Sequence, residues 1–464
     1  MCCKSERAAQ RLFGNKEVPA IMLLKLLREW TKDKKVLLLG FGREGRSLFR
    51  RLQKVGGWST VGIADQNPIN DAPEGVPLHI GETYQAAMLD YDIVFKSPGI
   101  VLQEEYKPEK LSCRVTSLTE LFLSAYRNQC IGITGTKGKS TTSSLLYHVL
   151  KEAGMPVVLG GNIGIPTADL YEEIKPETLI VLEIGVHQLE YNHVSPHTAA
   201  LLNLYEEHLD HYGTFEYYAY CKENIYRNQT EDDLLICGVP GLPAEGDCKA
   251  KILRLAMDDE AADISLINDV LCYGSDYLEL PENMPLTGEH NRYNCAVVFA
   301  IARRIGISAE EILHGIETFE PLPHRLSPIG TYNGIIWYDD SISTACETCI
   351  QALNALPDTD TVLIGGMDRG ISYTPLLEYL DKSPVPHIIL MSDSGKRMEE
   401  EAKSFSANLQ ERLYYSADLE GAVALAKGLT APGKICLLSP AAASYNAYKN
   451  FEKRGEHFQE LAKA

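Results

Sequence analysis

The sequence predicts an α/β protein in which three successive domains each contain a largely parallel sheet. Short apolar segments alternate with helical patterns along most of the 464 residues, which is typical of βαβ units. Two glycine-rich loops, at residues 40–45 and 135–140, each follow an apolar segment and precede a helical pattern. Because the chain is too long for one hydrophobic core, we expect a Rossmann-like domain at 1–118, a central P-loop ATPase-type domain at 119–322 and a second Rossmann-like domain at 323–464.

The composition and net charge of the chain restrict the kinds of molecule that it can bind. The chain has 44 basic and 63 acidic residues and a net charge of −19, which disfavours nucleic acid and anionic membranes as partners. No segment approaches the roughly 18 apolar residues of a membrane helix, and residues 19–30 resemble an amphipathic helix rather than a signal peptide. The 12 cysteines are scattered, so we expect reduced thiols and a cytoplasmic location. We also expect small-molecule substrates and a monomer.

Short apolar segments along the chain are candidates for β-strands. They are 35–39, 60–64, 93–96, 131–134, 179–183, 198–203, 234–237, 335–338, 361–364, 388–391 and 434–438. Cys346 and Cys349 have metal-site spacing, but they fall in a helical pattern without a second pair, so a structural role is favoured.

The first glycine loop has the spacing of a dinucleotide-binding fingerprint. Gly40, Gly42 and Gly45 follow the first strand candidate, and Asp65 ends the next strand 20 residues after Gly45. Glycines allow a diphosphate to approach the backbone at a helix N-terminus, where an acidic residue can meet a ribose. The loop could therefore serve an NAD-dependent oxidoreductase, hold another nucleotide diphosphate, or be a tight turn without a ligand.

The second glycine loop indicates a triphosphate site. Residues 130–142 read CIGITGTKGKSTT, and a helical pattern runs from Ser140 to Ala153. Backbone N–H groups can surround an anion here, Lys139 can neutralise β- and γ-phosphates, and the Ser140 hydroxyl can hold Mg²⁺. Ile133 stands where the usual pattern has its first glycine, which leaves a simple strand-to-helix turn as the alternative.

Two polar residues follow strands of the central domain. Glu183 ends one strand candidate and His208 follows the next, at the edge where α/β proteins place their sites. We interpret Glu183 as a Mg²⁺ ligand shared with Ser140, and His208 as a second ligand. A surface glutamate and a solvated histidine are the structural alternatives.

Five blocks together resemble the Mur ligases, and within that family the members that add glutamate to UDP-N-acetylmuramoyl-L-alanine. Their order and spacing are specific, although each block alone is weak, and the resemblance covers nearly the whole chain after residue 34. Besides the phosphate loop they are GNIGIP at 161–166, LEIGVHQLE at 182–190, NLYEEHLD at 203–210 and TGEHNRYN at 287–294. The C-terminal third adds His324-Arg325, Asp340-Ser341, GGMDRG at 365–370, LSPAAAS at 438–444 and KNFEKRG at 449–455.

The resemblance implies a set of site residues. For ATP it implies Gly135, Thr136, Lys137, Gly138, Lys139, Ser140, Thr141, Asn291, Asn294, Arg325 and Asp340. For the UDP substrate it implies Gly40, Gly42, Gly45, Asp65, Ser97 and Asn162, and for glutamate Thr344, Arg369, Ser444 and the backbone at Phe451. It further implies that Lys139, His208 and Lys222 are catalytic. It also implies two Mg²⁺ sites, with ligands from Ser140, Glu183, His208 and Lys222.

Lys222 lies on a helical pattern, where a lysine is ordinarily solvated. The resemblance implies instead that it is carbamylated, which would convert a cation into an anionic oxygen ligand of the hard kind that Mg²⁺ prefers. A neutral amine is needed to capture CO₂, and burial near other cations would supply it by lowering the lysine pKa.

The implied reaction is ATP-dependent amide formation through an acyl phosphate, in peptidoglycan precursor synthesis with D-glutamate. Ile342 stands where many members have lysine, Gly185-Val186 where many have Ser-Ser, and Lys137 where asparagine is common. These departures keep L-glutamate open as the amine. Other Mur-type or folate-type ligases, an NAD-dependent oxidoreductase and a non-catalytic nucleotide-binding relative remain as alternatives.

Overall fold

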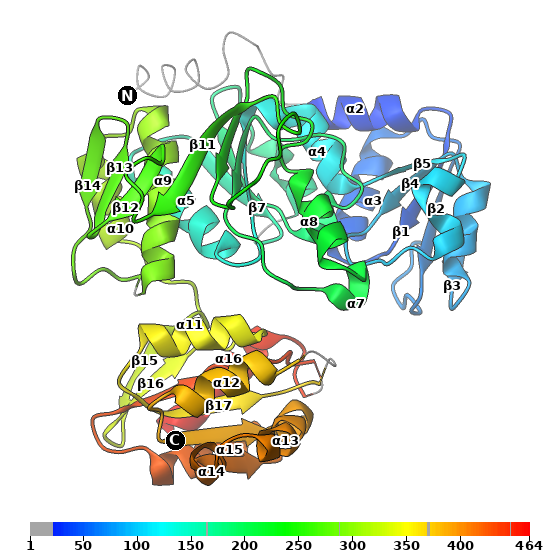
Figure 1. Cartoon of the computed structure of the whole chain (residues 1–464). Coiled ribbons are helices and arrows are strands. Elements are labelled where there is room, and N and C mark those ends of the chain that lie inside the picture. The colour runs from blue at the N-terminus through cyan, green and yellow to red at the C-terminus, as the bar shows by residue number, and fades with distance from the viewer. Residues whose placement is uncertain (1–21, 164–165, 287, 369–371, 446) are drawn as a thin grey trace. The chain divides into compact units, whose positions relative to one another are not determined.

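The computed structural model describes residues 22–163, 166–286, 288–368, 372–445 and 447–464. It divides into two compact units. The first runs up to Met284 and includes Arg292–Phe319, and the second combines Pro285–Asn291 with Glu320–Ala464. Figure 1 shows the helices and strands of both units.

The first unit contains a five-stranded parallel sheet near its N-terminus. The strands are β1 (Lys35–Leu39), β2 (Thr60–Asp65), β3 (Leu78–Ile80), β4 (Ile93–Lys96) and β5 (Arg114–Thr116), in the order β3-β2-β1-β4-β5. Helices α2 (Met22–Thr31), α3 (Arg43–Val55) and α4 (Leu118–Tyr126) accompany it. The strand order reverses between β1 and β4, and ligands of doubly wound sheets bind at such a reversal.

A nine-stranded sheet forms the rest of the first unit. Its strands are β6 (Cys130–Thr134), β7 (Val157–Gly161), β8 (Leu179–Glu183), β9 (Thr198–Leu201), β10 (Leu234–Cys237), β11 (Lys251–Met257), β12 (Ile264–Ile267), β13 (Val270–Tyr273) and β14 (Asp276–Glu279). The order is β14-β13-β12-β11-β10-β9-β6-β8-β7, parallel from β7 to β12 and antiparallel beyond. The helices are α5 (Lys139–Glu152), α6 (Val186–Leu189), α7 (Leu209–Tyr212), α8 (Phe215–Glu223), α9 (Glu289–Ile305) and α10 (Ala309–Glu317).

The second unit has a six-stranded sheet with helices on both faces. The strands are β15 (Ser327–Tyr332), β16 (Ile335–Asp339), β17 (Thr359–Gly365), β18 (His387–Met391), β19 (Leu413–Ser416) and β20 (Ile435–Leu438), in the order β15-β16-β20-β17-β18-β19. Only the β15–β16 pair is antiparallel. The helices are α11 (Cys346–Ala355), α12 (Thr374–Lys382), α13 (Ser392–Glu401), α14 (Ala407–Glu411), α15 (Leu419–Leu429) and α16 (Phe451–Lys463).

The predicted fold class is confirmed: all three sheets are largely parallel and alternate with helices. Sequence reasoning missed β3, β5, β7, β11–β15 and β19, many of which are short or lie at sheet edges, where half-exposed strands carry no continuous apolar run. Within the described residues, no helix combines the length and apolarity needed to cross a bilayer.

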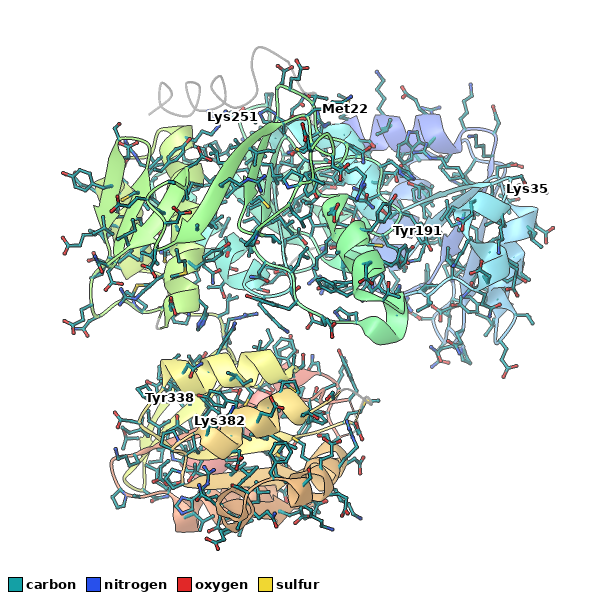
Figure 2. The ribbon with its side chains drawn as sticks, viewed as in Figure 1. Met22, Lys35, Tyr191, Lys251, Tyr338 and Lys382 are labelled. Carbon is teal, nitrogen blue, oxygen red and sulfur yellow. The ribbon has the colours of Figure 1, made fainter. Side chains whose placement is uncertain are left out.

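Polar contacts join the N-terminal sheet to the central sheet within the first unit. The Asp169 carboxylate accepts a hydrogen bond from Ser47 Oγ at 2.7 Å and pairs with Arg51 at 2.7 Å. Lys96, at the end of β4, pairs with Glu190 at 3.2 Å, and both side chains are buried. Tyr191, labelled in Figure 2, lies beside this pair with Lys96 Nζ 5.6 Å from its ring centroid. The two sheets are thus linked by both a partly exposed and a buried ion pair.

In the N-terminal glycine loop, residues 40–45, the closest packing against the backbone is at Gly45. A Cβ there would lie 2.2 Å from the carbonyl oxygen of Gly40, whereas a Cβ on Gly42 would meet nothing within 4 Å. We expect Gly45→Ala to lower the free energy of unfolding by about 1–3 kcal/mol through overpacking. Chemical denaturation checks this, with Gly42→Ala as the matched control in the same loop. Equal stability of the two variants would contradict the close-packing explanation.

Candidate active site

The phosphate loop is packed too tightly for side chains at its turning points. It leaves β6 at Thr134 and enters α5 at Lys139. Gly138 has φ +85°, and a Cβ there would lie 2.7 Å from Asn294 Oδ1. A Cβ on Gly135 would lie 2.9 Å from the Leu202 side chain. The structure therefore brings the predicted loop together with Asn294 of α9, one of the residues that the resemblance assigns to ATP.

Two lysines of the site share one backbone acceptor. Lys139 Nζ donates to the carbonyl oxygens of Gly135 and Thr136, both at 2.9 Å. Lys222 Nζ donates to the same Gly135 oxygen at 2.8 Å. Lys222 is buried, and burial, reinforced by the charge of Lys139, holds its pKa well below the ordinary lysine value. The helix α8 thus brings a buried lysine of lowered pKa to the phosphate loop.

A carboxylate faces this group of lysines. Glu207 Oε1 pairs with Lys137 Nζ at 2.7 Å. Burial acts to raise the pKa of Glu207, but the positive charges of Lys137 and Lys139 outweigh it and bring the pKa to about 2. The side chain of Asn203 holds the loop from the same side, since its Oδ1 accepts from Lys137 N at 2.8 Å. Sequence reasoning did not identify Glu207, which is one residue before the predicted His208.

Glu183 has an oxygen suited to a divalent cation. It is buried at the end of β8, and its Oε1 accepts from Asn162 Nδ2 at 2.7 Å. Its Oε2 is buried without a hydrogen-bond partner, although a buried carboxylate oxygen is costly to leave unpaired. A hard cation would satisfy it. Among the described residues no three His, Cys, Asp or Glu side chains converge as a metal cluster, and the predicted set contains just two of those types, Glu183 and His208.

His208 lies in an aromatic cluster that the sequence did not reveal. Its backbone has φ +56°, and its ring is 4.8 Å from that of His187 on α6. His187 Nδ1 is 2.8 Å from the Tyr212 hydroxyl. Burial, with the neighbouring charges of His208 and His211, lowers the pKa of His187 to about 3, so that imidazole is neutral. The helix α6 and the segment that contains His208 and α7 are joined by a connection that includes β9, and only the packing of that connection brings the rings together.

A cavity of about 920 Å³ opens between the N-terminal and central sheets of the first unit. The predicted substrate residues Gly40, Gly42, Asp65, Ser97 and Asn162 all line it. Asp65 fixes the nucleotide loop, because its Oδ2 accepts from Phe41 N at 2.9 Å. Gly45 contributes through its packing against Gly40. Glu44 and Gln188 also line the cavity and were not among the predicted residues.

The remaining predicted residues belong to the second unit. They are Asn291, Arg325, Asp340, Thr344, Ser444 and Phe451, whereas Arg369 lies outside the described residues. Asp340 is buried, and its two oxygens accept from Leu326 N at 3.1 Å and Ser439 Oγ at 2.8 Å. Burial raises its pKa to about 7, against the opposing charge of Arg325. The Phe451 carbonyl accepts from Ser341 Oγ at 2.8 Å.

The family model of the Mur ligase middle domain matches residues 133–302. The chain is 32% identical over 402 residues to the UDP-N-acetylmuramoylalanine–D-glutamate ligase of Symbiobacterium thermophilum, covering 84% of this chain and 88% of that one. It is 32% identical over 444 residues to the ligase of the same name from Streptococcus agalactiae, covering 92% and 96%.

A solved structure has the same fold. The MurF ligase from Thermotoga maritima, in complex with ADP, has a TM-score of 0.59 and 18% identity, and the match covers 95% of this chain and 99% of that one. At this identity the likeness concerns the fold.

The raised pKa of Asp340 predicts a pH-dependent stability. Between its ordinary pKa of 3.8 and about 7 the folded state keeps a proton that the unfolded state releases, so stability falls as pH rises through this window. We expect Asp340→Asn to remove that decline. Urea unfolding at pH 5 and pH 7 checks this: the parent should lose more stability between the two than the variant, and equal losses would contradict the buried, protonated carboxyl.

Proposed function

This chain belongs to the Mur ligase family, and we propose that it joins UDP-N-acetylmuramoyl-L-alanine to D-glutamate at the expense of ATP. The single observation that carries the proposal is the shared Gly135 carbonyl: it fixes Lys139 and the buried Lys222 at the same phosphate loop. The relatives at 32% identity are named for this ligation. The reaction supplies a precursor of peptidoglycan.

The proposed reaction proceeds in two steps, and the first of them requires two anions to meet. The terminal carboxylate of the UDP substrate attacks the γ-phosphorus of ATP, which forms a C–O–P bond and releases ADP. The amine of glutamate then attacks the acyl carbonyl, and the C–O bond to phosphate breaks as phosphate leaves. Two anions must first approach each other, and Lys139 neutralises part of their charge. The loop N–H groups and the start of α5 orient the phosphates.

Mg²⁺ fits the residues present. Glu183 Oε2, the Ser140 hydroxyl and His208 would hold it in two sites, and it would supply charge neutralisation for the phosphates. Lys222 would complete the set as a carbamate. Its lowered pKa favours the neutral amine that reacts with CO₂, and the new carboxylate would be attracted to the charge of Lys139. His208 would also position the substrate or remove a proton.

The remaining predicted residues would bind ATP and the incoming glutamate. Asn291, Asn294, Arg325 and Asp340 would hold adenine, phosphate and ribose. Thr344, Arg369, Ser444 and Phe451 would hold glutamate, since a guanidinium fork matches a carboxylate. We place the enzyme in the cytoplasm as a monomer and keep domain limits at 1–118, 119–322 and 323–464.

L-Glutamate remains the second candidate for the amine. Ile342 removes a lysine that many family members have, and Gly185-Val186 replace a common Ser-Ser. A direct comparison of the two enantiomers decides between them.

The proposed reaction predicts ADP release that requires both the acceptor and the amine. We expect turnover with UDP-N-acetylmuramoyl-L-alanine and D-glutamate, and little with L-glutamate. Lys139→Ala should lower turnover at least about 100-fold, because the transferring phosphate loses its counter-charge, while circular dichroism remains unchanged. Lys151→Ala, an exposed lysine at the far end of α5, is the control. Near-normal turnover by Lys139→Ala would refute the phosphate-loop assignment.

The carbamate predicts a chemical rescue. Lys222→Ala should lose most activity because it removes the anionic oxygen ligand, and short carboxylic acids such as acetate should restore part of it. Steady-state ADP release with increasing acetate measures this, with Lys139→Ala as the variant that acetate should not rescue. A Lys222→Ala enzyme that works normally without additives would exclude the carbamate.

A further inference from the structure

Glu44 connects the N-terminal nucleotide loop with the central sheet. It lies in the first turn of α3, between two glycines of the loop. Its Oε1 accepts a hydrogen bond at 3.0 Å from Nε2 of Gln188 on α6. Gln188 in turn accepts from the backbone N–H of Gly185 at 3.0 Å, two residues after Glu183. The hydrogen bond between Glu44 and Gln188 therefore crosses the boundary between the N-terminal sheet and the central sheet.

Glu44 and Gln188 also line the substrate cavity. The cavity takes further lining from Asp65, Gln66 and Asn67 at the end of β2 and from Gly161 and Asn162 at the end of β7. Asn162 donates to Glu183, so the lining from β7 adjoins the carboxylate assigned to the phosphate chemistry. A substrate with its nucleotide against the end of β2 and its reacting carboxylate near Glu183 has to extend from the N-terminal sheet to the central sheet. In the proposed substrate the amino sugar lies between those two groups.

The Glu44 carboxyl group has unused acceptor capacity. Its Oε2 is buried and has no hydrogen-bond partner, and one donor leaves most of the lone pairs of the group vacant. A buried oxygen left in this state destabilises the free protein. Burial raises the pKa of Glu44, whereas the bond from Gln188 and the charges of Arg43 and Lys96 oppose the rise. A ligand donor would satisfy the vacant oxygen.

We propose that Glu44 is a substrate-positioning residue that accepts a hydrogen bond from a hydroxyl or acetamido N–H of the amino sugar. This inference rests on the proposed function. A diphosphate cannot be the partner of a carboxylate, because it offers oxygens alone and carries like charge, and the loop N–H groups beside Glu44 already suit it. Neutral donors of a sugar have the opposite character. Glu44 would thus hold the sugar as its acyl end reaches the phosphate loop.

The test replaces the acceptor with a donor of the same shape. In Glu44→Gln, the amide oxygen stays with Gln188 and the NH₂ group takes the position of Oε2. We expect the KM for UDP-N-acetylmuramoyl-L-alanine to rise about tenfold or more, with the KM for ATP unchanged and the Kd for UDP within about twofold of the parent. UDP lacks the sugar, so its binding also reports that the variant is folded. Glu44→Asp, which keeps the charge but shortens the reach, should fall between.

Each outcome of the Glu44→Gln measurement either supports or overturns the proposed role of Glu44. Glu74→Gln, an exposed carboxylate of the same unit, controls for loss of charge and should leave the KM unchanged. A parent-like KM in Glu44→Gln would overturn the inference while leaving the ligase function intact, and would indicate a protonated Glu44 acting as donor. Equal loss of affinity for UDP and for the full substrate would also overturn it, because the contact would then be to the nucleotide. Failure of the parent chain to ligate would overturn both proposals.

Discussion

The carbonyl oxygen of Gly135 is the point on which the active site depends. Lys139 donates to it from the start of α5, and Lys222 donates to it from α8. Burial, reinforced by the charge of Lys139, holds the pKa of Lys222 well below its ordinary value. One backbone oxygen thereby holds a buried lysine and a partly exposed lysine at the same loop.

This arrangement exists because the loop has no side chains at its turns. Leu202 and Asn294 occupy the space that Cβ atoms of Gly135 and Gly138 would take. The loop is therefore held by β9 on one side and α9 on the other, and its N–H groups stay oriented before any nucleotide arrives. Such preorganisation reduces the reorganisation that a charged transition state would otherwise require.

Charged pairs link the two sheets of the first unit. Asp169 pairs with Arg51 where the carboxylate is partly exposed, and Glu190 pairs with Lys96 in a buried position. Asp65 and Ser97 of the N-terminal sheet and Asn162 of the central sheet line one cavity. A buried charged pair contributes little net stability, but it favours the one arrangement of the two sheets in which both charges are satisfied.

Local patterns in the sequence determined much of this protein. The α/β class, the two glycine loops, Lys139, Asp65 and Glu183 all follow from residue types at strand ends, because a strand, a turn and a helix N-terminus are built from neighbours in the chain. The family's order of blocks added Lys222 and Asn162. The tertiary structure alone supplied Glu207, His187 and the contact of Glu44 with Gln188, whose partners are not neighbours in the sequence. The lowered pKa of Lys222 also belongs there, since burial and the charge of Lys139 arise only when α8 packs against the loop, and no spacing of residues records that contact.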